Sequence, residues 1–320
     1  MTGSSLLVRL GHALGVMVLV ALLTFLLIDF APGGYLDDLA TNPEISAESI
    51  ARMRTQFGLD LPFYRKFWRW TTSIAAGDFG YSFVYQRPVK QLIAERILNT
   101  ILLNIVALTL AWGVGLALGI GAAAARGSPV DWAIGSATAI LQACPGVIVA
   151  VMLLALAARL GLPIGGLTAG DPGAANAGVL DRVRHLLMPA TAIALVWLPA
   201  IARHMRAALV AALDAPYNVL GARARGIGPW RLLLVHALRE ALAPLSTLFG
   251  LSLSAILSAS LVVEVVMSWP GIGQLAYDAV FKRDVFLVVD LVQLSAILLL
   301  VGNAVSDLLL RRLDPRTAGA

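Results

Sequence analysis

Charged residues are scarce in this sequence. They make up 13% of its 320 residues, about half of the roughly one quarter that soluble domains carry. Hydrophobic residues reach 59%, against about 45–50% in an average soluble domain. So little charge is not enough to cover a surface in water, which excludes a water-soluble enzyme and a disordered scaffold. An integral membrane protein is the class that remains.

Cysteine and the motifs of common catalytic sites are also missing. The single cysteine, Cys144, excludes a disulfide-stapled secreted domain. No Gly-x-x-x-x-Gly-Lys-Ser/Thr segment is present, so the chain lacks that phosphate-binding loop for ATP. The four histidines show no His-x-x-x-His spacing, and Cys-x-x-Cys does not occur, which argues against a zinc peptidase. We therefore expect no catalytic residue, no metal ligand and no bound cofactor in this chain.

Six long runs with little or no charge are the candidates for membrane spans. About 20 residues of helix cross a bilayer, and a backbone in lipid must satisfy its own hydrogen bonds, which favours helices. The runs lie between Arg9 and Asp29, Arg96 and Arg126, Asp131 and Arg159, His185 and Arg203, and Glu240 and Glu264, with the sixth from Val285 to Ser306. The sequence therefore predicts an all-α membrane protein with six transmembrane helices. The first run has no small-residue cleavage site after it, so we interpret it as an uncleaved anchor.

Small residues and prolines interrupt several of these runs. Glycines would suit close helix packing, and prolines would suit kinks, although each taken singly can also be explained as only shaping the bundle. The residues concerned are Gly113, Gly115, Gly119, Gly121, Pro145, Pro189 and Pro199.

The placement of basic residues predicts the orientation, because short cytoplasmic loops are enriched in lysine and arginine. One face would carry eleven arginines: Arg9, Arg126, Arg203, Arg206, Arg223, Arg225, Arg231, Arg239, Arg311, Arg312 and Arg316. The opposite short loops would carry five basic residues: Arg159, Arg182, Arg184, Lys282 and Arg283. Both termini are thus expected in the cytoplasm. This divides the chain into residues 1–31 (N-terminus and first helix), 32–95 (extracytoplasmic subdomain), 96–312 (five-helix core) and 313–320 (cytoplasmic tail).

The outer segment, residues 32–95, has the features of a folded subdomain lying on the membrane. Ser46 is placed to open a helix that runs to Phe57 and ends at Gly58. Gly77 to Gly80 predicts a turn. Four aromatic residues resemble a membrane-interface cluster: Phe63, Phe67, Trp68 and Trp70.

The cytoplasmic loop, at about residues 204–240, is the most informative segment. A helical stretch from Gly221 reaches Gly226, Gly228-Pro229 breaks the chain, and Trp230 begins an amphipathic helix. Such a basic and partly apolar knob would either enter a groove on a partner protein or lie on anionic lipid. The residues alone leave both interpretations open.

Four stretches of the sequence resemble one family. The loop contains Ala222-Arg223-Ala224-Arg225-Gly226-Ile227 and, further on, His236-Ala237-Leu238-Arg239-Glu240-Ala241-Leu242. The other stretches are Phe57-Gly58-Leu59-Asp60-Leu61-Pro62, Gly77-Asp78-Phe79-Gly80-Tyr81-Ser82 with Arg87-Pro88-Val89, and Val263-Glu264 with Trp269-Pro270-Gly271-Ile272-Gly273. They are similar to motifs of integral-membrane permease subunits of ATP-binding-cassette (ABC) importers, in the dipeptide, oligopeptide and nickel branch. The resemblance covers about Leu6 to Arg312.

This resemblance implies a type I ABC importer permease fold and a role in forming the translocation pathway of an ATP-driven importer for peptides or a nickel complex. It implies a multi-pass protein of the bacterial inner membrane, in contact with lipid and not with nucleic acid. The implied partners are a homologous second permease subunit, two cytoplasmic ABC ATPase subunits that hydrolyse the ATP, and an extracytoplasmic solute-binding protein.

The resemblance also implies two sets of site residues. The ATPase-coupling loop would comprise Ala222, Arg223, Ala224, Arg225, Gly226, Ile227, Trp230 and His236. The outer gate and its structural motif would comprise Gly77, Asp78, Gly80, Ser82, Glu264, Pro270, Gly271 and Gly273. We expect apolar burial of Ile227, Trp230 and Leu233 to carry most of the docking, and we expect Trp269 to Gly273 to form a tight non-helical cap.

Two departures from the family pattern leave the substrate undetermined: Asn218 stands where the family usually has tyrosine, and Pro145-Gly146-Val147 replaces Pro-x-Phe. The alternative function is an ion-coupled secondary transporter that acts without ATPase partners. It would use acids in or near the runs, of which Asp290 is the best placed, because intramembrane acids can relay protons.

Overall fold

The computed structural model describes residues 3–30, 33, 40, 46–58, 60–167, 178–215, 221 and 224–313. Ala222, Arg223, Asn218 and the tail from residue 314 lie outside the described residues. The chain forms two compact units, each continuous in space but not in sequence. The first comprises Met1–Asn99 and Gly271–Leu300, and the second comprises Thr100–Pro270 and Val301–Ala320.

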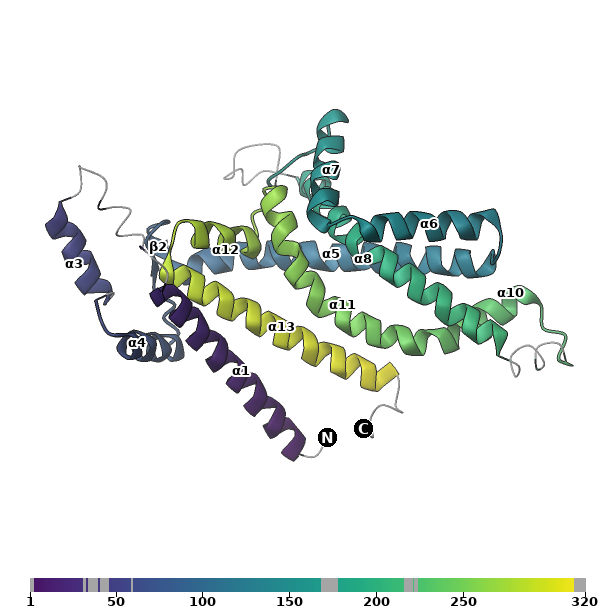
Figure 1. The fold of residues 1–320 in the computed structure, drawn as a ribbon, viewed down its shortest axis with the longest axis horizontal. Coiled ribbons are helices and arrows are strands. Elements are labelled where there is room, and N and C mark those ends of the chain that lie inside the picture. Colours follow the sequence, from purple (N-terminus) through teal and green to yellow (C-terminus); the bar gives the residue numbers. More distant parts are fainter. Residues whose placement is uncertain are drawn as a thin grey trace. The chain divides into compact units, whose positions relative to one another are not determined.

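The first unit combines the N-terminal part of the chain with residues 271–300 (Figure 1). Its elements are α1 (Gly3–Phe30), α3 (Ala47–Phe57), α4 (Phe63–Ala75), β1 (Tyr81–Ser82), β2 (Arg87–Pro88), α12 (Ile272–Phe281) and the adjoining parts of α5 (Val89–Ala124) and α13 (Val285–Leu313). β1 pairs with β2 in antiparallel register, with Tyr81 opposite Pro88 and Ser82 opposite Arg87. A core of Val89, Leu92, Ile272, Leu275, Ala279, Leu287 and Leu291 joins α5, α12 and α13.

Local capping determines α3 as the sequence predicts. The Ser46 hydroxyl accepts a hydrogen bond from the backbone N–H of Ser49 at 3.2 Å, which satisfies one of the free donors at a helix start. Gly58 ends the helix in the left-handed conformation, with φ of +68°, where glycine carries no steric penalty. The prediction of a helix ending at Phe57 is confirmed.

The second unit is a bundle built around the long helix α8. Its elements are the rest of α5 and α13, α6 (Pro129–Ala143), α7 (Gly146–Arg159), α8 (Val179–Asp214), α10 (Pro229–Arg231), the π-helix η1 (Leu232–Ala237) and α11 (Leu238–Val266). α8 packs against α6, α7, α11 and η1.

Among the described residues, five helices are long and apolar enough to cross a membrane, or six if α6 and α7 together are one span. The expectation of a single helix through the third run is wrong, because α6 and α7 meet at an angle of 105°. The break falls at Cys144-Pro145, where Cys144 is extended (φ −81°, ψ 125°). Proline disfavours helical geometry in the residue before it and lacks the N–H that would continue the ladder.

Two of the four glycines in α5 allow close contact with α8. A Cβ on Gly119 would lie 2.6 Å from the carbonyl oxygen of Ala202 and 2.6 Å from the Cβ of Met205. A Cβ on Gly115 would lie 2.9 Å from a methyl group of Ile201. The helix backbones therefore approach more closely than any larger residue permits. Gly113 and Gly121 have no such neighbour within 4 Å.

The segment after α11 differs in part from the expected non-helical cap. Trp269 and Pro270 are irregular, but Ile272 and Gly273 already belong to α12, so the cap is shorter than predicted. Gly271 is the N-cap of α12 in extended geometry, and its carbonyl accepts a hydrogen bond from Leu275 at 3.2 Å. An additional short helix therefore follows Pro270, and the sequence pattern did not predict it.

Candidate functional site

The loop between α8 and α11 reverses direction at Gly226. Residues 221 and 224 are helical, Arg225 and Gly226 form a turn, and Gly226 has a φ of +63°. Only glycine adopts this region without a steric penalty. Gly228 is the N-cap of α10 and Pro229 occupies its first turn, where the missing N–H of proline costs nothing. The helix–turn–helix predicted for this loop is confirmed over its described residues.

Among the described residues, one side of this hairpin is exposed. Ala224, Arg225, Gly226 and His236 are exposed, and Ile227 is half-buried. Trp230 is 67% exposed. A Cβ placed on Gly226 would meet no atom within 4 Å, so the surface around the turn is open. These described loop residues therefore form a projecting surface.

The other side of the hairpin belongs to the core of the second unit. Leu233 is only 4% exposed and packs with Met205, Leu209, Ala237 and Ala241. The expectation that Leu233 would help to dock a partner is therefore wrong. The neighbouring Leu234 and Val235 are exposed instead, and the family motif of this loop did not indicate them.

The π-helix η1 explains this change of face. It carries the chain from Arg231 to α11, and the N–H of Leu238 bonds to the carbonyl of Leu233. A π-helix has i→i+5 hydrogen bonds, so each turn holds more residues than a turn of α-helix. Side chains in and after the π-helix therefore point in other directions than α-helical spacing predicts. Single π-turns occur frequently at functional sites. No local sequence signal predicts this one.

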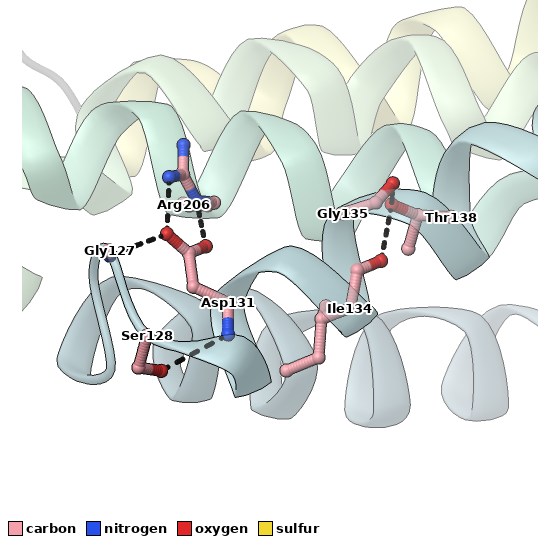
Figure 2. A network of polar contacts seen from close by, with 7 residues as sticks. All are labelled: Gly127, Ser128, Asp131, Ile134, Gly135, Thr138 and Arg206. Carbon is pink, nitrogen blue, oxygen red and sulfur yellow. Dashed lines mark hydrogen bonds and ion pairs between the residues drawn. The ribbon is translucent and has the colours of Figure 1, made fainter.

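An ion pair holds the part of α8 that leads into the hairpin (Figure 2). Arg206 donates two hydrogen bonds to Asp131, from Nε to Oδ1 at 2.6 Å and from Nη2 to Oδ2 at 2.7 Å. Asp131 also accepts from the N–H of Gly127 at 3.0 Å, and its own N–H bonds to the Ser128 hydroxyl at 3.4 Å. Bidentate arginine–carboxylate pairs fix orientation as well as distance.

A second, exposed pair lies at the end of α8. Arg126 Nη1 donates to Asp214 Oδ1 at 2.7 Å, so the turn between α5 and α6 contacts α8 at two positions. Sequence reasoning counted Arg206 and Arg126 only as basic residues of one face. Ser128-Pro129 is a helix-start signal that could have located the N-terminus of α6, but no local pattern pairs Asp131 with a residue 75 positions away.

The outer motif of the first unit is built around Asp284. Ser82 donates to Asp284 Oδ2 at 2.6 Å, and the N–H of Val84 donates to the same oxygen at 3.1 Å. The Ser82 hydroxyl also accepts from the N–H of Tyr85 at 3.1 Å. Burial raises the pKa of Asp284, while the bonds from Ser82, Val84 and Leu287 act to lower it. Asp284, which the motif did not include, thus ties the β1–β2 hairpin to the start of α13.

The preceding turn places the remaining outer residues of this unit. Gly77 and Gly80 have φ values of +79° and +73°, so both positions require glycine. Asp78 Oδ1 accepts from the N–H of Gly80 at 3.0 Å, which is an Asx-type turn. Gly271 and Gly273 belong to the same unit, at the start of α12.

Glu264 and Pro270 belong to the second unit. The Glu264 side chain is fully buried, and Thr100 donates to its Oε1 at 2.9 Å. Its carbonyl accepts from the N–H of Trp269 at 2.8 Å, and Trp269 is packed in the core with Leu103 and Ile193. Glu264 and Trp269 therefore organise the end of α11. Among the described residues, no group of three or more histidine, cysteine or acidic side chains could hold a metal ion.

Comparison with known proteins identifies similar chains over nearly the whole length. Residues 115–319 match the family described as binding-protein-dependent transport system inner membrane component, and residues 4–104 match the N-terminal region of such a component. The oligopeptide transport system permease protein AppB of Bacillus subtilis is 32% identical over 300 residues, which is 93% of each chain. The glutathione transport system permease protein GsiC of Salmonella paratyphi A is 33% identical over 308 residues, 96% of each chain.

Two further similarities agree with these. A probable peptide ABC transporter permease protein, y4tP of Sinorhizobium fredii, is 31% identical over 317 residues, 98% of this chain and 99% of the relative. Among solved structures, the inward-facing MetNI methionine ABC transporter superposes with a TM-score of 0.56 at 20% identity, over 70% of this chain and 97% of that one. At this identity the likeness is one of fold alone.

Proposed function

The chain belongs to the family of binding-protein-dependent transport system inner membrane components, and we propose that its hairpin at Gly226 is the surface through which ATP hydrolysis in partner subunits drives transport. It is a multi-pass inner-membrane permease subunit of an ABC importer. The observation that supports the coupling role is the division of the hairpin into a projecting side, with Trp230 exposed, and a side packed in the core.

Trp230 is the anchor of the proposed contact. Buried tryptophans dominate many protein interfaces, and their truncation costs about 2 kcal/mol or more. Exposed arginine pairs contribute only about 0–1 kcal/mol each, so Arg225 and Arg231 select the orientation of a partner more than they hold it. A partner groove that accepts Trp230 and Ile227 would carry most of the affinity.

The buried side of the hairpin would transmit movements of the ATPase subunits to the membrane helices. Leu233 and Ala237 pack directly against Met205 and Leu209 of α8, and the Arg206–Asp131 pair joins α8 to α6. Close-packed interiors shift between discrete arrangements and do not deform gradually. A displacement of the hairpin by closing ATPases would therefore move α8, α6 and α11 together.

We further propose that the cargo consists of short peptides. The relatives that match this chain over more than nine tenths of both lengths are named for oligopeptide, peptide and glutathione transport. The proposed assembly is this chain, a homologous second permease, two ABC ATPase subunits and a solute-binding protein outside the membrane. The proposed orientation has both termini and the Gly226 hairpin in the cytoplasm, in accord with the distribution of basic residues.

The ion-coupled secondary transporter is not favoured by this family membership. Its best candidate residue, Asp290, is buried in α13 and accepts a hydrogen bond from Trp70 Nε1 at 2.9 Å. That contact gives Asp290 a role within the first unit that needs no proton relay.

The docking role is tested by truncating Trp230 in the reconstituted complex. Trp230→Ala is expected to weaken co-purification of the ATPases by about 30-fold, which corresponds to about 2 kcal/mol. Trp68→Ala is the matched control, since Trp68 of α4 is 69% exposed and lies outside the hairpin. Equal ATPase binding by wild type and Trp230→Ala would refute the docking role and leave the hairpin as a lipid-surface element.

A further inference from the structure

A cavity of about 410 Å³ lies within the first unit. Its walls come from the end of α3, from one side of α4, from the turn after Asp78 and from the start of α13. Lys66, Arg69, Trp70, Ser73, Asp78 and Tyr81 supply its polar groups. This volume is in the range of small-molecule sites. Asp78 and Gly80 of the outer-gate motif line the cavity, but no ligand has been assigned to it above.

The helices around the cavity place it at the level of the membrane interface. Phe25, which lines it, lies near the end of the apolar stretch Gly11–Phe30 of α1. Val285 and Phe286, on another wall, begin the apolar stretch Val285–Val305 of α13. Gln293 Nε2 donates to the carbonyl of Met17 at 3.2 Å, so α1 and α13 run side by side. Both stretches therefore leave the bilayer at the cavity, at the depth of lipid headgroups.

Two cationic side chains line the cavity, and one of them has no ion-pair partner among the described residues. Lys66 is paired with Asp29, with 2.5 Å between Nζ and Oδ1. Arg69, by contrast, makes no ion pair within the part of the chain that the structure describes, and its side chain is exposed. A Cβ on Gly58 would lie 2.6 Å from Nη1 of Arg69, so the glycine leaves the space that the guanidinium occupies. The planar guanidinium matches the geometry of a phosphate group.

The remaining walls suit a ligand that is polar at one end and apolar at the other. Phe25 packs edge-on against Trp70, with 5.3 Å between ring centroids, and Trp70 is held in place by its bond to Asp290. Tyr81, Phe79 and Phe286 line the cavity as well. Tryptophan and tyrosine are enriched where proteins meet lipid headgroups. A free inorganic anion would bind to the cationic side chains but would make no contact with this aromatic wall.

The geometry points to a phospholipid site in this cavity, with the phosphodiester group against Arg69 and the first carbons of the acyl chains against Phe25 and Trp70. Asp78, whose Oδ1 accepts from the N–H of Gly80, lies on the same wall and would face an ammonium group in a zwitterionic headgroup. The bound lipid would join α3 and α4 to the ends of α1 and α13. This site goes beyond the transport role and does not depend on the cargo or on ATPase docking.

The test is lipid retention by the full chain, purified with the subunits that accompany it and delipidated in detergent. Native mass spectrometry follows the addition of phosphatidylethanolamine or phosphatidylglycerol. We expect wild type to retain phospholipid, and Arg69→Gln to bind it about tenfold more weakly, as is typical for loss of one charged hydrogen bond. Arg65→Gln is the matched control, because Arg65 lies on the same helix, over the ring of Tyr64, and does not line the cavity.

Equal retention by wild type, Arg69→Gln and Arg65→Gln would overturn the proposal. So would displacement of the lipid by millimolar inorganic phosphate, which would assign the site to a free anion. Because Arg69 is exposed, its replacement should leave the fold intact, and gel filtration with an unchanged melting temperature verifies this. Arg69→Glu, with reversed charge, should abolish retention and gives a second, independent reading.

Discussion

The guanidinium of Arg206 donates two hydrogen bonds to the carboxylate of Asp131, at 2.6 and 2.7 Å. Asp131 is buried beside the N-terminus of α6, and Arg206 lies in α8, two turns before its end at Asp214. The pair joins the two helices about two turns before the chain leaves α8 for the Gly226 hairpin. The proposed coupling role requires a stiff connection between α8 and α6, so that a displacement of the hairpin moves both helices.

Replacement of Asp131 by asparagine should loosen this attachment. Asparagine keeps the size and still accepts from Gly127, but it removes the negative charge from a buried position beside Arg206. We expect a lower melting temperature in detergent and a smaller transport-coupled ATPase rate at unchanged ATPase binding. Asp214→Asn is the control, since the Arg126–Asp214 pair is exposed and should contribute only about 0–1 kcal/mol. Equal melting temperatures for the two variants would contradict this role of Asp131.

Two glycines of α5 should respond to alanine in opposite directions. At Gly119 a Cβ would meet the backbone of Ala202 at 2.6 Å, so Gly119→Ala forces α5 and α8 apart at a cost of about 1–3 kcal/mol. At Gly121 the space is open, and Gly121→Ala should stabilise the helix by about 0.5–1 kcal/mol. Thermal unfolding of the two variants measures the difference, and a shift of the same sign in both would contradict the close contact.

The tie between Ser82 and Asp284 should depend on pH. Burial raises the pKa of Asp284 above its value in the unfolded chain, so its effect on stability is most favourable below about pH 4 and is lost as the pH rises through the folded-state pKa. Ser82→Ala removes a donor to the charged form and raises that pKa further. We therefore expect Ser82→Ala to lower the melting temperature more at pH 7 than at pH 4. In an Asp284→Asn background, which cannot ionise, the dependence on pH should vanish.

Local sequence signals predicted much of the secondary structure. Features that depend on contacts between distant residues could not be predicted from them. Ser46 and Gly58 predicted both ends of α3, because capping depends on residues within one turn. The 105° bend at Pro145 exceeds the kink that a proline alone suggests, and both α6 and α7 contact α8, an arrangement that depends on long-range packing.

The candidate site shows the same limit. Gly226 and Gly228-Pro229 predicted the break between two helical segments, and the structure has a turn there with a φ of +63° at Gly226. Leu233, expected to help dock a partner, lies in η1 and packs with Met205 and Leu209, and no local sequence pattern predicts a π-helix there. The Ser82–Asp284 contact spans 202 positions, so no periodicity or local motif could have paired the two residues.

The central claim, that the Gly226 hairpin couples ATP hydrolysis to transport, is tested most directly by Gly226→Asp in the reconstituted complex. The measurement is ATP hydrolysis stimulated by the loaded solute-binding protein, together with co-purification of the ATPases. Gly161→Asp is the matched control, because Gly161 also has a positive φ, of +65°, and a Cβ at that position would meet no atom within 4 Å. Both variants therefore carry the same backbone strain and the same added charge.

We predict that Gly226→Asp inserts normally but loses stimulated hydrolysis and retains less ATPase, that Ala224→Asp does the same, and that Gly161→Asp keeps both activities. Wild-type stimulation and wild-type ATPase retention in Gly226→Asp would contradict the account.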